Sequence, residues 1–305
     1  MGVPSLFRTL FKKHPDIVSK NVNNIDNLFL DFNCVIHNSK CISHLDLQVI
    51  DEVINQTANI ITKISPSKMV YIAIDGPVPM GKLVKQRERR YKKIYDDYNV
   101  QCIYHKFNQP IPHFFDSNKI SPGTLFMETL HNKMKEAIES NRFGDLQIIL
   151  DDSNEKGEGE FKIFNYIRSH QQTKGTSCIF SMDADIIILS MMIRKSNIFI
   201  LRQDCENGNQ FIDINQLKKQ IVHMINNKCE YPQRIINDVC FLSLLGGNDF
   251  VQPIIQFKIR DSGWDNIISI YFKNITLSAG SSKNCIKIPI TIKIYKINCT
   301  ISYSY

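Results

Sequence analysis

The sequence predicts an α/β fold with a mostly parallel central sheet flanked by helices. Short apolar runs alternate with segments of helical periodicity along most of the chain. These runs are continuously apolar, as in strands buried on both faces, and several end at an acidic residue. The 305 residues are 43% hydrophobic and 22% charged, a globular composition that can bury a sizeable core.

The first half of the chain supplies the first strands and helices of this pattern. The stretch "PSLFRTLFKK" has the apolar stripe of a short amphipathic helix. "NLFLDFNCVIH" and "KMVYIAIDG" contain predicted strands that deliver Asp31 and Asp75, and a long basic helix, "GKLVKQRERRYKKIYDDY", follows. The next helix is expected to begin with Ser121 as its N-cap and Pro122 in its first turn.

The second half continues the alternation. "DLQIIL", "SCIFSMDAD" and "NIFIL" are predicted strands, "GEGEFKIFNYIRSHQ" is a loop leading into a helix, and "NDVCFLSLLGGNDF" is a helix that ends at a Gly-Gly-Asn turn. No apolar run reaches the roughly 18 residues of a membrane span, and the N-terminus lacks the apolar core of a signal peptide. We therefore expect an intracellular protein, cytoplasmic or nuclear, with no membrane partner.

Acidic residues recur at the ends of the predicted strands and the starts of the helices. Ligands of open α/β sheets bind beyond the carboxyl ends of the strands, so these acids are expected to converge there. Crowded carboxylates need compensating positive charge, and hard oxygen ligands suit Mg²⁺ or Mn²⁺. Asp183 and Asp185 are expected to point the same way from an extended segment, although a lone D-x-D is more often a helix cap or a turn. The full set is Asp31, Asp75, Glu158, Glu160, Asp183, Asp185 and Asp249.

The basic segment forms a second group of interest. Its helical spacing places Lys82, Gln86, Arg89, Arg90 and Lys93 on one face. Fixed cationic donors suit a phosphate. Because the segment begins just after Asp75, its first turns are expected to lie beside the acidic residues. The alternative is a solvated charged helix or a basic run like a nuclear-localisation signal. The net charge of +7 adds a mild preference for an anionic partner. The nine cysteines, with no C-x-x-C pair, indicate reduced thiols.

Seven segments together resemble the Xrn family of 5′→3′ exoribonucleases, within the flap-endonuclease and PIN-like superfamily of nucleases. They occur in the order and approximate spacing of that family: "MGVPSLFRTL", "LFLDFNCVIHN", "YIAIDGPVPMGKLVKQRERR", "FDSNKISPGTLFMETL", "GEGEFKIFNYIR", "SMDADIIILS" and "FLSLLGGNDF". The resemblance covers residues 1–275, so a nuclease domain is expected there. It implies a PIN-like nuclease core.

The resemblance also implies roles for individual residues. The seven acids named above are implied to hold two Mg²⁺ ions, with Mn²⁺ as a substitute. Lys82, Gln86, Arg89 and Arg90 are implied to bind the 5′-monophosphate of single-stranded RNA, and His37 to stack on its first base. The implied reaction is two-metal hydrolysis that releases mononucleotides during RNA turnover. A catalytically weak protein that binds RNA 5′ ends, and a flap-type DNA nuclease, are the alternatives.

The chain departs from the family pattern in two places. Cys34 stands where relatives usually have Gly, and Gly246 with Gly247 where they have a single Gly. Residues 276–305, including the alternating "IKIPITIKIYKI", match nothing in the family, and from the resemblance we expect the chain to lack the second conserved region of relatives. We expect this tail to be a diverged remnant, the end of a truncated reading frame or a small added strand.

Overall fold

The computed structural model describes residues 3, 5–39, 45–111, 115–170, 175–194, 197–204, 208–224, 232–254, 259 and 262–279. The chain divides into two compact units. Unit 1 comprises residues 1–17, 183–194 and 214–305, and unit 2 comprises residues 18–182 and 195–213. The predicted strand "IKIPITIKIYKI" lies outside the described residues.

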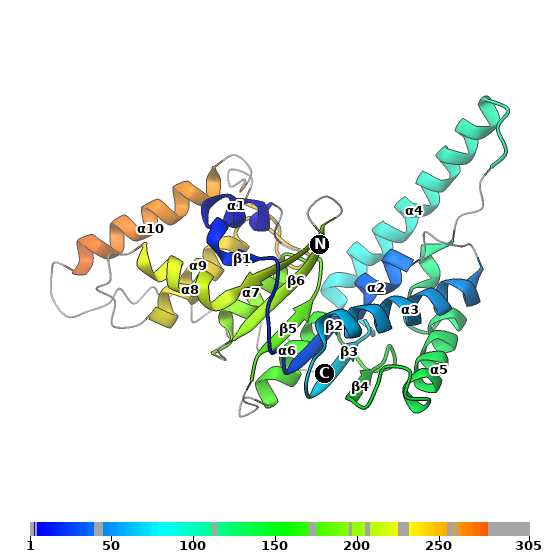
Figure 1. The fold of residues 1–305 in the computed structure, drawn as a ribbon. Coiled ribbons are helices and arrows are strands. Elements are labelled where there is room, and N and C mark those ends of the chain that lie inside the picture. Colours follow the sequence, from blue (N-terminus) through cyan, green and yellow to red (C-terminus); the bar gives the residue numbers. More distant parts are fainter. Residues whose placement is uncertain are drawn as a thin grey trace. The chain divides into compact units, whose positions relative to one another are not determined.

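A seven-stranded sheet in unit 2 confirms the predicted α/β class with a mostly parallel sheet (Figure 1). Its spatial order is β1-β7-β6-β5-β2-β3-β4. The pairs from β6 to β4 are parallel, whereas β7 pairs antiparallel with both β1 and β6. The strands are β1 (Val18–Ser19), β2 (Asn27–Asp31), β3 (Met69–Ala73), β4 (Gln147–Asp151), β5 (Ser177–Phe180), β6 (Ile198–Asp204) and β7 (Gly208–Asp213). The five predicted strands are β2 to β6, and the antiparallel strands β1 and β7 were not predicted.

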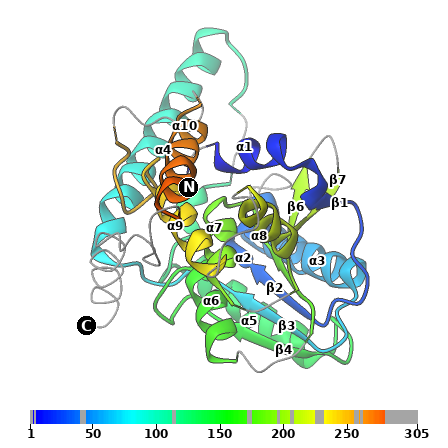
Figure 2. The same ribbon diagram turned by 90° about the vertical axis from the view of Figure 1, so that its left-hand side faces the viewer.

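The parallel register aligns the carboxyl ends of neighbouring strands, and Figure 2 shows β2, β3 and β4 side by side. Asp31 of β2 pairs with Ala73 of β3, which in turn pairs with Asp151 of β4. On the other side of β2, Leu30 pairs with Phe180, the last residue of β5. Residues that follow these strands therefore emerge at one edge of the sheet, where ligands of parallel sheets bind.

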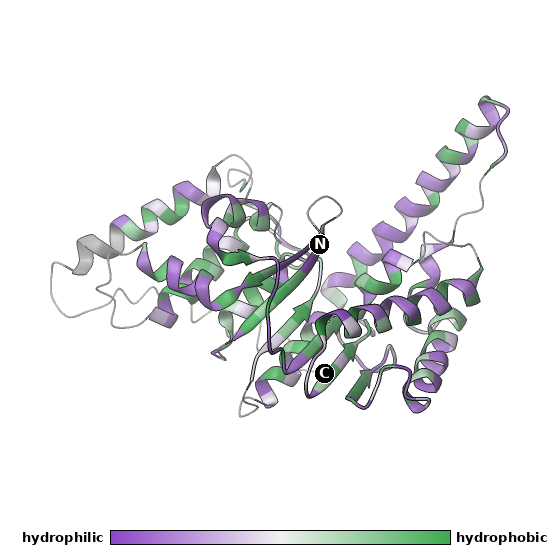
Figure 3. Cartoon of the chain, viewed as in Figure 1, coloured by the Kyte–Doolittle hydropathy of each residue, from purple (hydrophilic) through white to green (hydrophobic). Residues whose placement is uncertain are grey.

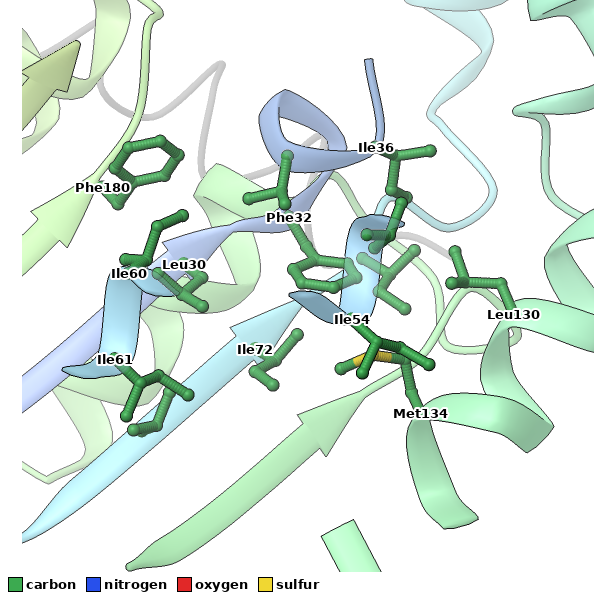
Figure 4. Close-up of a cluster of buried hydrophobic side chains, with 14 of the residues drawn as sticks. Leu30, Phe32, Ile36, Ile54, Ile60, Ile61, Ile72, Leu130, Met134 and Phe180 are labelled. Carbon is green, nitrogen blue, oxygen red and sulfur yellow. The ribbon is translucent and has the colours of Figure 1, made fainter. Parts of the chain in front are cut away.

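Three helices cover one face of this sheet: α2 (Phe32–Ser39), α3 (Asp46–Ile64) and α5 (Leu125–Glu139). Figure 4 shows strand residues such as Leu30 and Ile72 packed with Ile54 of α3 and Met134 of α5. The helix α3, which was not predicted, buries Val49, Ile50, Val53, Ile54, Thr57, Ile60, Ile61 and Ile64 at helical spacing. Its apolar face therefore completes the core on this side.

The opposite face of the sheet carries α6 (Gly159–Ser169). Its Tyr166 ring lies 4.6 Å from the Tyr71 ring of β3 and 6.1 Å from the Phe29 ring of β2, measured between centroids. Every residue of β2 and β3 is buried as a result. Burial on both faces explains why these strands are continuously apolar in the sequence and coloured as hydrophobic in Figure 3.

One predicted helix start is wrong. Instead of beginning at Ser121 and Pro122, α5 begins at Leu125, and Thr124 is its N-cap, accepting a hydrogen bond from the backbone N of Met127 at 3.4 Å. Gly123 has a φ of +82°, a left-handed conformation that interrupts any helix begun at Pro122. A 3-10 helix, Ser117–Lys119, precedes this turn.

The predicted basic helix is α4 (Met80–Lys106), the longest helix of unit 2 among the described residues. None of its residues is buried, and it projects from the sheet as a largely hydrophilic rod (Figures 1 and 3). Its role therefore does not lie in core packing.

Unit 1 is helical, with α1 (Leu6–Lys13), the 3-10 helix Pro15–Ile17, α7 (Asp185–Met192), α8 (Ile214–His223), α9 (Pro232–Leu244) and α10 (Gly263–Ala279). The predicted helices α1 and α9 are confirmed. The indole of Trp264 is buried and donates from Nε1 to Ser243 Oγ at 2.9 Å, which fixes α10 on α9. Within the described residues, no helix combines the length and apolar character needed to cross a membrane.

Candidate active site

Two predicted ligands, Asp31 and Asp75, face the first residue of α6 in unit 2. A methyl group on the Cα of Gly159 would lie 3.1 Å from Asp31 Oδ1 and 3.3 Å from Asp75 Oδ1. It would also lie 2.9 Å from the carbonyl oxygen of Ala73, closer than a carbon atom tolerates. Two carboxylate oxygens therefore flank one point, which glycine leaves open.

Both carboxylates are oriented by hydrogen bonds from neighbouring segments. Asp31, 8% exposed, accepts from Ser181 Oγ at 2.8 Å and from Cys34 Sγ at 3.4 Å. Asp75 accepts from the backbone N of Gly159 at 2.6 Å and from Asn33 Nδ2 at 2.9 Å, while its own backbone N donates to Asn33 Oδ1 at 3.1 Å. Burial and the Asp31 carboxylate raise the pKa of the Cys34 thiol, so that thiol remains a donor.

The next two predicted ligands lie at the start of α6, as the sequence indicated. Glu158 is the N-cap of this helix and Glu160 is in its first turn, and both are buried. The Nζ of Lys82 contacts the Glu158 carboxylate, and the two side chains are 11% and 5% exposed. This contact joins the basic helix α4 to the acidic residues. Lys82 is also one of the residues predicted to bind phosphate.

The other predicted RNA-binding residues of unit 2 are also placed by the structure. Gln86 is half-buried on α4, and Arg89 and Arg90 are exposed on the same helix. His37 is exposed in the last turn of α2, one turn beyond the Cys34 that contacts Asp31. The helix α4 thus presents the charged side chains of Arg89 and Arg90 to solvent, on the face that the helical spacing predicted.

The remaining three acids, Asp183, Asp185 and Asp249, belong to unit 1. The prediction of an extended segment carrying Asp183 and Asp185 is wrong, because Asp185 is the first residue of α7. Its backbone N donates to Asp183 Oδ1 at 3.2 Å, so Asp183 forms an Asx turn just before the helix, whose N-cap is Ala184. The alternation of side chains along a strand therefore does not apply to this pair.

Asp185 is held in an environment that disfavours its charge. Burial, with smaller contributions from the neighbouring carboxylates of Asp183 and Asp249, raises the pKa of Asp185 to about 6. The backbone N of Val3, which donates to Asp185 Oδ1 at 2.9 Å, acts in the opposite direction. Asp249, 6% exposed, follows the turn after α9. A cation near these three carboxylates would relieve their mutual repulsion.

Several residues that orient these acids were not singled out from the sequence. Asn33 links the ends of β2 and β3, Ser181 links the end of β5 to Asp31, and Gly159 provides the close approach between Asp31 and Asp75. Each lies within two residues of a predicted ligand. A search of the sequence for polar residues or glycines next to the predicted ligands would have found Asn33, Ser181 and Gly159. It would not have shown which acids they contact across the sheet.

The chemistry of these residues fits hard divalent cations. The donors available beside the shared point at Gly159 are carboxylate oxygens, which Mg²⁺ and Mn²⁺ prefer over nitrogen or sulfur. Among the described residues, no three His, Cys, Asp or Glu side chains lie close enough together to hold a metal ion as they stand. The carboxylates are instead held by protein donors, including Ser181, Asn33 and Lys82.

Residues 1–204 match the protein family described as "XRN 5'-3' exonuclease N-terminus". The chain belongs to this family. Membership confirms the resemblance found in the sequence, and it covers the segments that carry Asp31, Asp75, Glu158, Glu160, Asp183 and Asp185. Asp249 lies beyond the matched residues.

Similar proteins come from several fungi. 5′-3′ exoribonuclease 1 of Schizosaccharomyces pombe is 27% identical over 327 residues, covering 93% of this chain and 24% of that protein. 5′-3′ exoribonuclease 2 of Candida albicans is 26% identical over 355 residues, covering 91% of this chain and 37% of that protein. The chain thus spans between a quarter and two fifths of the length of these relatives.

Solved structures to which the chain is similar include two proteins in complex with DNA. The catalytic core of Rad2 with a DNA substrate has a TM-score of 0.46 and 14% identity, covering 97% of this chain and 78% of that one. Human GEN1 with Holliday junction DNA has a TM-score of 0.43 and 10% identity, covering 94% of this chain and 69% of that one.

Proposed function

We propose that this chain is the nuclease region of a 5′→3′ exoribonuclease that hydrolyses 5′-monophosphorylated single-stranded RNA to mononucleotides. The proposed nuclease region spans residues 1–275, and residues 276–305 are proposed to be a tail without site residues. Membership of the Xrn family supports this activity, and so do the fungal relatives, which are named 5′-3′ exoribonucleases 1 and 2.

The observation that carries the proposal is the contact between Lys82 and Glu158. It links a helix with a row of cationic donors to a group of carboxylates at the carboxyl ends of parallel strands. A phosphodiesterase requires both groups, since its substrate is anionic and its reaction develops further negative charge on phosphate. A fully solvated charged helix would not place a lysine side chain that is only 11% exposed against a buried glutamate in this way.

The residues of α4 are proposed to define the direction of hydrolysis. Lys82, Gln86, Arg89 and Arg90 would hold the terminal phosphate, because ionised donors bind phosphate more strongly than neutral ones. His37 would stack on the first base. A cap or a triphosphate exceeds the space of a pocket shaped for one phosphate, so the preferred end is a monophosphate.

The carboxylates are proposed to hold two Mg²⁺ ions, for which Mn²⁺ can substitute. The ligands in unit 2 are Asp31, Asp75, Glu158 and Glu160, and those in unit 1 are Asp183, Asp185 and Asp249. Divalent ions supply charge stabilisation for the phosphate and activate water as the nucleophile. The protein side chains orient the ions and the RNA end, and none of them needs to form a covalent bond.

The decisive experiment is a time course on 5′-labelled RNA with Mg²⁺, scored for released mononucleotide. Parallel reactions would use RNA with a 5′-hydroxyl end, a DNA flap, and EDTA in place of Mg²⁺. We expect mononucleotide release to be much faster from 5′-monophosphorylated RNA than from 5′-hydroxyl RNA or the DNA flap, and to be absent in EDTA. The Asp183→Asn, Asp185→Asn double variant should also be inactive while remaining folded, because it removes like charges from a crowded site.

Other outcomes distinguish the alternative functions. Tight binding of 5′-monophosphorylated RNA without turnover would favour a protein that binds RNA ends. Preferential cleavage of the DNA flap would favour a structure-specific DNA nuclease. Turnover that persists in EDTA would contradict the role of divalent ions.

A further inference from the structure

A buried lysine on α6 lies behind the glutamates that begin this helix. Lys162 is 6% exposed, and its Nζ lies 2.8 Å from Asp151 Oδ1 and 2.5 Å from the carbonyl oxygen of Asp152. Both acceptors lie at the carboxyl end of β4. Lys162, two residues after Glu160, therefore connects α6 to the end of β4.

The partner of Lys162 is itself fixed to the adjacent strand. Asp151 accepts a hydrogen bond of 2.5 Å from the phenol of Tyr71 on β3, which leads to Asp75. Burial and the Asp151 carboxylate raise the pKa of Tyr71, so the phenol keeps its proton and donates. One chain of contacts thus runs from β3 through Asp151 to the helix that carries Glu158 and Glu160.

The loop before α6 has its own, separate attachment. The backbone N of Gly76 donates to the carbonyl of Gly157 at 2.8 Å, and the backbone N of Gly157 donates to the carbonyl of Pro77 at 3.0 Å. These bonds hold the chain just before Glu158. One turn later, the Lys162 side chain contacts Asp151 and Asp152 at the end of β4.

We propose that Lys162 is a positioning residue for the metal ligands Glu158 and Glu160, acting through its contacts with Asp151 and Asp152. The inference rests on the proposed function, because it concerns how the chain orients two of the proposed ligands. Groups that orient metal ligands without touching the ion commonly change metal affinity about 10- to 100-fold when removed. Lys162 does not itself contact RNA or a metal ion in this proposal.

A structural role must be separated from a positioning role. Lys162→Met alone leaves the Asp151 carboxylate half-buried without its cation, which destabilises a protein whatever the lysine does. The double variant Asp151→Asn, Lys162→Met removes both charges, and such paired replacements commonly restore stability. A positioning role predicts that this double variant regains thermal stability but not metal affinity.

The experiment measures Mn²⁺ binding to the RNA-free full chain by electron paramagnetic resonance of the free ion, together with the thermal midpoint. We expect both Lys162 variants to bind Mn²⁺ about 10- to 100-fold more weakly than wild type. On 5′-monophosphorylated RNA, kcat should fall while KM stays within about threefold, since the phosphate-binding residues on α4 are unchanged. Lys68→Met is the matched control, because Lys68 also pairs with an aspartate, Asp26, at 2.9 Å, but at the amino ends of the strands, where no proposed metal ligand lies.

The control should lose stability without losing Mn²⁺ affinity. The inference is overturned if the stable double variant binds Mn²⁺ as wild type does, or if Lys68→Met weakens Mn²⁺ binding equally. A wild-type protein that binds no Mn²⁺ and releases no mononucleotide would instead overturn the proposed function, and this inference with it. If wild type binds Mn²⁺ and releases mononucleotide, and the Lys162 variants bind Mn²⁺ equally well, the proposed function stands and the positioning role of Lys162 is rejected.

Discussion

Strand β2 has an aspartate at each end, and the two have different surroundings. Asp26, just before the strand, accepts from the backbone N of Thr176 at 2.8 Å and from Ser67 Oγ at 3.1 Å, and pairs with Lys68 at 2.9 Å. These donors precede β5 and β3, so one carboxylate joins the amino ends of three strands. The Lys68 hydrogen bond is the main cause that lowers the pKa of Asp26.

Asp31, at the other end, lies beside a second carboxylate. Its hydrogen bonds to Ser181 and Cys34 come from uncharged donors, and its Oδ1 shares the space beside Gly159 with Asp75. The amino end of the sheet thus pairs a carboxylate with a cation, a backbone amide and a hydroxyl group, which favours stability. The carboxyl end instead crowds two carboxylates against the Cα of Gly159, an arrangement that favours cation binding over stability.

The same substitution at both ends gives the largest expected difference. Asp31→Asn removes a charge from the proposed metal site and should lower kcat by about 100- to 1,000-fold, the range for losing one electrostatic contact to the transition state. Asp26→Asn should leave kcat within about twofold, because Asp26 lies at the opposite end of a strand. Initial rates on 5′-monophosphorylated RNA at saturating Mg²⁺ measure both. Equal losses of activity in the two variants would contradict the division between the two ends.

A second comparison uses two glycines of unit 2. Gly159→Ala places a methyl group 3.1 Å from Asp31 Oδ1 and 3.3 Å from Asp75 Oδ1, and so should displace these carboxylates. A displacement of this kind commonly lowers activity about 100-fold. Gly81→Ala is the control, since a methyl group there meets no atom within 4 Å and alanine favours the α4 helix.

Rates at several Mg²⁺ concentrations would compare the two alanine variants. We expect a higher Mg²⁺ midpoint for Gly159→Ala and wild-type rates with slightly higher stability for Gly81→Ala. An active Gly159→Ala variant with an unchanged Mg²⁺ midpoint would show that the close approach of Asp31 and Asp75 to Gly159 is not part of the metal site.

The phosphate-binding face of α4 gives a smaller, substrate-dependent effect. Each ionised contact to phosphate contributes about 1.5 to 3 kcal/mol, so Arg89→Ala or Arg90→Ala should lower kcat/KM about 10- to 100-fold on 5′-monophosphorylated RNA. On 5′-hydroxyl RNA the contact is already absent, and the loss should be slight. Arg87→Ala, an exposed arginine away from this face, should behave alike on both RNAs. Parallel losses on both RNAs in Arg89→Ala would indicate general attraction to the RNA backbone.

Sequence patterns predicted the local features of this molecule and missed the long-range ones. The apolar runs of β2 to β6 and the helical spacing of α4 depend on neighbouring residues, so they were read correctly. The start of α5 was wrong because Gly123 adopts a positive φ, which no spacing rule reveals. The Asn33–Asp75 and Lys162–Asp151 contacts join segments brought together only by strand order, which the sequence alone does not specify.

The conformation of Asp183 and Asp185 illustrates a further limit. The pair follows an apolar strand and precedes an apolar run, and that pattern fits both an extended segment and a helix start. The eight residues of α7 are apolar on nearly every side, so periodicity could not decide between them. The sequence therefore singled out these aspartates as predicted ligands but did not give their backbone conformation.

The smallest expected effect concerns the amino end of β2 and its dependence on pH. Asp26→Asn removes the charge that pairs with Lys68 and weakens two hydrogen bonds, so it should lower the free energy of unfolding by about 1 kcal/mol near pH 7. Because folding lowers the pKa of Asp26 below its ordinary value of 3.8, its stabilisation is present above that pH and is lost as the pH falls through the folded-state pKa. The stability difference between wild type and Asp26→Asn should therefore shrink in acid. Urea unfolding between pH 7 and pH 3 measures it, with Asp51→Asn, at an exposed position on α3, as the control that should follow wild type throughout. A difference that stayed constant into acid would mean that Asp26 joins the strands by shape alone, and the contrast with Asp31 would then not be one of charge.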